Sequence, residues 1–210
     1  MNLKFKYGLD FELRRAMDTL AELDWFNSEG YEPKLPKGIN KKSTKKEIQK
    51  QIMKEFDKKK YEESIKNINS YFQIIKEELS ANLKKFIKKN TPMTFLIYLT
   101  NYGVGGAYNL PNIVIFNINC ADDFNIIIHE IIHLLVEGLV KKYNIQHWEK
   151  ERIVDLILNL KEFSFLKYNY WQEDYNNTEK YIDDLFNKYF LKNPEDFFSK
   201  IEKARLSINI

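Results

Sequence analysis

The strongest constraint on the fold is an apolar segment, residues 124–140, that also carries four ionisable side chains. It reads FNIIIHEIIHLLVEGLV, and its apolar residues fall on every side of a helix. Such a helix is expected to be buried. A membrane span is not expected, because His129, Glu130, His133 and Glu137 would be costly in lipid. The segment therefore predicts a buried helix whose polar groups need partners.

The two histidines have the spacing of a metal site. His129 and His133 are four residues apart, so their imidazoles lie one above the other on one face of the helix and can reach a single ion. Glu130, next to the first histidine, can lean over the open side of the metal without binding it. From there it can take a proton from zinc-bound water and pass it to a leaving amine.

A catalytic zinc needs a third protein ligand and an open fourth position. Glu137 lies one turn beyond His133, where a straight helix cannot bend it around the same ion. Glu151 is 18 residues after His133, which is enough for a turn and an antiparallel helix. Asp155, four residues later on the same face, can accept the free N–H of a ligand imidazole. Four downstream residues are candidates, of which Glu151 is the best supported: Glu137, His147, Glu149 and Glu151.

The pattern His129-Glu-Ile-Ile-His133 followed by Glu151-Arg-Ile-Val-Asp155 resembles the gluzincin, or thermolysin-like, class of zinc metallopeptidases. The resemblance covers residues 93–160 and implies one zinc ion held by His129, His133 and Glu151. It also implies Glu130 as the general base and Asp155 as a support for a ligand histidine. No HxxGxxH continuation follows His133, so the metzincin pattern does not fit.

The segment before the helix that carries His129 and His133 adds to the resemblance. In gluzincins an edge strand beside this helix pairs with the extended substrate, and here a strand and a glycine-rich turn precede it. The turn would let a peptide approach closely, although a plain hairpin turn explains the same residues. The implied substrate-binding residues are Gly105, Gly106, Ala107 and Tyr108.

The group that stabilises the oxyanion is less defined by the sequence. Gluzincins use a Tyr or His beside the metal, and His147 is the one histidine left over. A histidine in a turn is also commonly a surface residue. The tyrosines that remain as alternatives are Tyr102, Tyr108, Tyr143, Tyr168 and Tyr170.

The rest of the chain is expected to be mostly helical, with a small strand pair, which gives an α+β class. We expect an N-terminal helical region at 1–90 and a zincin-like core at 91–210, packed as one compact unit. The 44–89 region forms one helix or two. The expected helices are 10–24, 44–89, 122 or 123 to 143, 148–162, 177 or 178 to 190, and one from Pro194; the expected strands are Met93–Thr100 and Ile113–Ile118.

Composition narrows the class of protein. The chain has 210 residues, 44% of them hydrophobic, and a net charge of +3, which is too balanced for a dedicated nucleic-acid binder. Its single cysteine, Cys120, excludes an internal disulfide framework and fits a reducing compartment. With no recognisable signal peptide, we expect a cytoplasmic protein that acts on a peptide or protein substrate.

Two alternatives to a peptidase stay open. One is a metal hydrolase that acts on a non-peptide amide or ester. The other is a non-catalytic helical binding protein with a structural or vestigial zinc site. The second would gain if His147 were a fourth ligand, because structural zinc sites are usually closed by four protein ligands.

Overall fold

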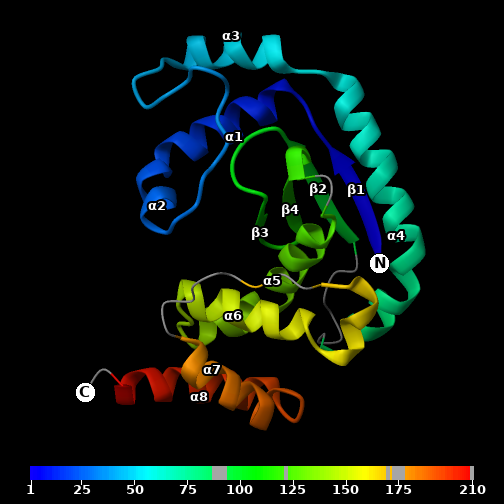
Figure 1. Cartoon of the computed structure of the whole chain (residues 1–210), viewed down its shortest axis with the longest axis vertical. Coiled ribbons are helices and arrows are strands. Elements are labelled where there is room, and N and C mark those ends of the chain that lie inside the picture. Colours follow the sequence, from blue (N-terminus) through cyan, green and yellow to red (C-terminus); the bar gives the residue numbers. More distant parts are fainter. Residues whose placement is uncertain (87–93, 121–122, 169–170, 172–177, 209–210) are drawn as a thin grey trace. The chain divides into compact units, whose positions relative to one another are not determined.

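The computed structural model describes residues 1–86, 94–120, 123–168, 171 and 178–208 (Figure 1). The chain forms two compact units, Met1–Lys76 with Pro92–Glu130, and Glu77–Thr91 with Ile131–Ile210. Two of the three boundaries fall inside continuous helices, α4 (Lys58–Phe86) and α5 (Asn125–Lys142), and the third lies outside the described residues. The class is α+β and mostly helical, as the sequence predicts.

The first unit contains a mixed four-stranded sheet with the order β1-β2-β4-β3. The strands β1 (Asn2–Lys6), β2 (Thr94–Thr100) and β4 (Ile113–Asn117) are parallel, and β3 (Gly106–Asn109) pairs with β4 in the antiparallel direction. The two predicted strands are confirmed as β2 and β4, with Met93 outside the described residues. They occupy the centre of the sheet, which explains their almost continuous apolar sequences.

The two outer strands, β1 and β3, are not among the predicted elements. The alternation of Leu3 and Phe5 with Lys4 and Lys6 is the signal for β1, because one face of this edge strand is more exposed than the other. The segment expected to be a glycine-rich turn is in part a strand, since Gly106–Asn109 pair with β4. Both strands exist because of the partners they pair with. The partner of β1 is β2, which is far along the chain, and the partner of β3 is β4, across a hairpin.

The first helices place polar residues against the sheet. Helix α1 (Leu9–Ala21) is followed by the short α2 (Leu23–Ser28). Of the apolar residues at helical spacing in this region, Leu20 is buried and Leu13 packs against the core, whereas Met17 is 38% exposed. The side chains that α1 buries are Glu12, Arg15, Ala16, Thr19 and Leu20.

Residues 45–86 form two helices, which resolves the alternatives left by their periodicity. Helix α3 (Lys45–Glu55) begins at a capping box, in which Thr44 Oγ1 accepts a hydrogen bond from the Glu47 N–H. The helical conformation is interrupted between α3 and α4. Where α4 begins, Asp57 Oδ1 accepts a hydrogen bond from the Lys59 N–H at 3.0 Å. Side chains of α1 and α3 share a core with Tyr102: Ala16, Leu20, Ile48 and Ile52.

The second unit is helical over its described residues. It contains the end of α4, most of α5, α6 (His147–Leu158), a 3-10 segment η2 (Lys161–Leu166), α7 (Glu179–Leu185), a π-helical turn η3 (Phe186–Phe190) and α8 (Pro194–Ile208). The expected helix from Pro194 is present as α8, and Asn193 Oδ1 accepts a hydrogen bond from the Glu195 N–H at 3.1 Å where it begins. None of the helices in the described ranges combines the length and hydropathy that crossing a bilayer requires.

Candidate metal centre

Local sequence signals position the two helices that carry the candidate ligands. Asp123 Oδ1 accepts a hydrogen bond from the Asn125 N–H at 3.0 Å where α5 begins, while Asp122 lies outside the described residues. Helix α6 begins at His147, behind a capping box formed by Gln146 and Glu149. Ile127, Ile128, Ile131 and Ile132 are almost completely buried, so the polar residues between them lie in an apolar helix.

The predicted ligands form one group. His129, His133 and Glu151 each offer a donor atom within 4.8 Å of the others. His133 Nε2 lies 3.2 Å from Glu151 Oε2, and these two side chains are buried, whereas His129 is partly buried. Two imidazoles and a carboxylate are a donor set that suits zinc. The described residues therefore contain a group that could hold a metal ion.

The second oxygen of Glu151 faces two basic groups. Lys150 Nζ lies 3.5 Å from Glu151 Oε1, and His147 Nδ1 lies 3.8 Å from the same atom. The three-residue group does not include His147, which is on the same helix one turn before Glu151. Among the described residues the donor set therefore has three members, as an open catalytic site requires.

The other two acidic candidates, Glu137 and Glu149, have contacts elsewhere. Glu149 is fully buried and forms an ion pair with Arg205, and its Oε2 accepts a hydrogen bond from the Gln146 N–H at 2.7 Å. Tyr181 also donates a hydrogen bond to Glu149. Glu137 lies 3.5 Å from Lys141 Nζ, one turn further along α5. Neither belongs to the metal-binding group.

Glu130 lies beneath the first residue of β3. Its side chain is 8% exposed, and a β-carbon at Gly106 would lie 2.9 Å from Glu130 Cγ and overlap Oε1. A β-carbon at Gly105 would meet Ile126 Cδ1 at 3.3 Å, a milder contact. Ala107 and Tyr108 continue β3 opposite Ile115 and Val114. The structure thus brings the predicted substrate-binding segment against the predicted general base.

Asp155 is fully buried, and its Oδ1 accepts a hydrogen bond from the Tyr168 hydroxyl at 2.7 Å. Among the tyrosines considered for oxyanion stabilisation, Tyr102 donates to Glu55 at 2.8 Å and Tyr143 to Glu195 at 3.4 Å. Tyr108 is in β3, and Tyr170 lies outside the described residues. The Tyr168 hydroxyl thus contacts a residue of the predicted site directly.

Arg15 is a charged residue near Glu130 that sequence reasoning missed. It is 8% exposed, and the charge of Glu130 is among those that stabilise its cation. The available signal was a row of polar side chains at helical spacing, Glu12, Arg15 and Thr19, between apolar residues. Periodicity identifies such a row but not which side of the helix faces the core.

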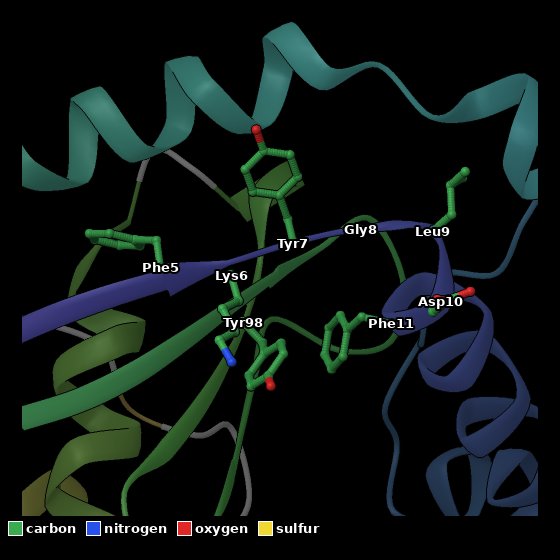
Figure 2. Close-up of a pocket in the computed structure, with 8 residues that line it drawn as sticks. All are labelled: Phe5, Lys6, Tyr7, Gly8, Leu9, Asp10, Phe11 and Tyr98. Atoms are coloured by element: carbon green, nitrogen blue, oxygen red, sulfur yellow. The ribbon is translucent and has the colours of Figure 1, made fainter.

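A separate cavity of about 610 Å³ lies where β1 leads into α1, lined by residues 5–11 and Tyr98 (Figure 2). Phe11 stacks on Tyr98 with ring centroids 4.4 Å apart, and Lys6 Nζ lies 5.9 Å from the Tyr98 ring. In Figure 2 Tyr7 points to the opposite side of β1 from Lys6. None of the candidate ligands lines this cavity.

Comparisons with protein-family models, with curated proteins and with solved structures found no match to this chain.

Proposed function

We propose that this protein is a zinc-dependent peptidase of the gluzincin type, with His129, His133 and Glu151 as ligands and Glu130 as general base. The observation that carries the proposal is the convergence of the three donor groups within 4.8 Å, beside a buried glutamate that is not one of them. A purely structural zinc site would not require that additional carboxyl group.

The ligand geometry is consistent with zinc. Bonds of about 2.0–2.1 Å in a tetrahedral arrangement separate neighbouring donor atoms by roughly 3.3 Å. The 3.2 Å between His133 Nε2 and Glu151 Oε2 is close to that value. The same distance also permits a direct hydrogen bond, which an ion would replace. Lys150, 3.5 Å from the other oxygen, favours the ionised carboxylate that a metal needs.

Each residue then has a defined task. A bound zinc ion supplies the Lewis acidity that polarises the scissile carbonyl. Glu130 takes a proton from the attacking water and delivers it to the leaving amine. Asp155 orients a ligand imidazole, and Tyr168 holds Asp155 by its 2.7 Å hydrogen bond. Burial of Glu130 and His133 excludes bulk water from the proton transfer.

The substrate would bind to β3. This strand ends the sheet order, so one of its edges has no partner strand among those described. An extended peptide can add to such an edge through main-chain hydrogen bonds. Because Gly106 has no side chain, the strand passes directly against Glu130, which would place the scissile bond near the general base.

The test is zinc content and peptide hydrolysis in three proteins. Wild type should bind one zinc ion per chain and cleave members of a mixed peptide library. His133→Ala should lose the metal, whereas Glu130→Gln should keep it and lose about 10²–10⁴-fold in kcat, the usual contribution of a general base. Elemental analysis and mass spectrometry of the digested library give the two readouts.

A matched control is Glu137→Gln, which removes a glutamate from the same helix, one turn beyond His133, outside the ligand group. It should retain both zinc and activity. Zinc binding without hydrolysis of any peptide, ester or amide would indicate a structural site, and hydrolysis of esters or non-peptide amides alone would indicate the other hydrolase class. Failure to take up zinc would contradict the proposal.

A further inference from the structure

A segment from outside the sheet bonds to the backbone just ahead of β3. The Lys34 N–H donates to Gly103 O at 3.0 Å, and the Gly103 N–H donates to Lys34 O at 2.8 Å, so the two residues form an antiparallel bridge. The partner of this segment in β4 is Asn117, whose N–H donates to Gly105 O at 2.9 Å and whose Nδ2 donates to Gly103 O at 3.1 Å. Lys34 therefore occupies the outer edge of the chain at Gly103.

The outer edge of β3 itself begins three residues later. The bridge to Lys34 is isolated, so it does not continue along β3. Backbone groups alternate in direction along a strand, and Gly105 O bonds to β4, so the N–H and C=O of Gly106 face the outer edge. This is the edge proposed for the substrate, and Glu130 lies against Gly106. Three residues span at most about 10 Å, so a peptide on this edge meets Lys34 soon after it passes the general base.

The side chain of Lys34 places a positive charge near the start of β3. It is exposed, and therefore open to a ligand from solvent. Burial and Asp123 raise the pKa of the Cys120 thiol, and the charge of Lys34 opposes that rise. A β-carbon at Gly105 would lie 3.7 Å from Cys120 Sγ, so the ammonium group acts close to this glycine. An ammonium group there attracts a carboxylate and repels the amino terminus of a peptide.

We propose that Lys34 binds the C-terminal carboxylate of the substrate, and that the protein removes one or two residues from the C-terminus of peptides. This inference rests on the proposed function. The peptide would lie antiparallel to β3, with its C-terminus towards Gly103. An extended peptide advances about 3.3 Å per residue, so one or two residues fit between a scissile bond at Gly106 and the Lys34 backbone. A longer C-terminal part would collide with that backbone.

The reaction is a hydrolysis that consumes one water molecule. It breaks the C–N bond, leaving a new carboxylate on the shortened peptide and an amine on the released fragment. The test uses two copies of one library of N-acetylated ten-residue peptides, one with free C-termini and one with C-terminal amides. Mass spectrometry should show products of the free acids that lack one or two C-terminal residues. Cleavage distributed over internal bonds would overturn the inference.

The preference for the free acid gives the second readout. For a peptide found in the first experiment, kcat/KM should be about fivefold higher for the free acid than for its amide, the scale of an exposed ion pair. Lys34→Gln should bring this ratio close to one, whereas Lys34→Arg, which keeps the charge, should retain the preference. Lys37→Gln is the matched control, because it removes an exposed lysine of the same segment and should leave the ratio unchanged.

Two further observations separate the possible failures. The bridge to Gly103 uses only backbone atoms of Lys34, so Lys34→Gln should unfold at the wild-type temperature and its effect on the ratio cannot come from a loss of folding. Equal rates for acids and amides, or an unchanged ratio in Lys34→Gln, would overturn the inference and leave the proposed function standing. Hydrolysis of neither library by the zinc-loaded protein would contradict the proposed function, and the inference with it.

Discussion

The absence of a side chain at residue 106 allows β3 to approach Glu130. A β-carbon there would overlap Glu130 Oε1 and lie 2.7 Å from Ile126 Cγ2, so Gly106→Ala must displace the carboxylate. We expect this variant to keep its zinc and to lose about 10²-fold in kcat, the scale of a misplaced catalytic group. Peptide hydrolysis and elemental analysis would check both expectations.

Gly105→Ala is the control for that substitution. Its β-carbon would contact Ile126 Cδ1 at 3.3 Å and no atom of Glu130, and neither glycine has a positive φ that would itself disfavour alanine. Activity should fall much less than in Gly106→Ala. Equal losses in the two variants would show that the effect comes from the backbone of the segment and not from Glu130.

Asp155 offers a second prediction for a single residue. It is fully buried on α6, four residues after Glu151, and accepts a hydrogen bond from Tyr168. If it orients a ligand imidazole, Asp155→Asn should weaken zinc binding about 10–100-fold, the usual effect of losing such a support. Competition with a chromophoric chelator measures this affinity. Tyr168→Phe should cause a smaller loss, because it removes only the group that holds Asp155.

Among the elements, α3 owes its first turn to a capping box. Thr44 and Glu47 exchange hydrogen bonds with each other's backbone N–H groups. Thr44→Ala should lower the free energy of unfolding by about 1 kcal/mol, the typical cost of losing an N-cap. Urea unfolding followed by circular dichroism gives this value, and Lys45→Ala, which leaves the cap intact, should be close to wild type.

The same cap predicts a pH dependence. The hydrogen bond from the Thr44 N–H lowers the pKa of Glu47 below its ordinary value of 4.5. The ionised carboxylate is therefore favoured in the folded state, and its contribution is present above pH 4.5 and lost as the pH falls through the folded pKa. Glu47→Gln should be less stable than wild type at pH 7, and the difference should shrink towards pH 3. A difference that is constant with pH would contradict this assignment.

For the whole molecule, zinc should link metal binding to stability. An ion that binds only the folded chain at 100 times its Kd adds about 2.7 kcal/mol. For a chain of this length that corresponds to a rise of roughly 5–10 °C in Tm. Differential scanning calorimetry with added zinc or chelator should show this change in wild type and none in His133→Ala. An identical response of both proteins would mean that zinc acts at another position.

Much of the candidate site could be predicted from the sequence because its geometry is local. The spacing of His129 and His133 depends only on helical periodicity. To bring Glu151 beside them, the chain has only to turn once between two consecutive helices. Both predictions match the group found in the structure. The central strands were similarly evident, since β2 and β4 are apolar segments flanked by turn residues.

What the sequence alone determined is therefore the helix that carries the histidines, the carboxylate that lies beside them and the mostly helical class of the chain. The tertiary structure decided which face of α1 is buried, that Gly106 begins a strand beside Glu130, and that Arg15 packs on Gly103. These features depend on contacts between residues that are distant along the chain. Periodicity specifies the repeat of a helix or strand, but the partner that covers each face is set only when the elements pack.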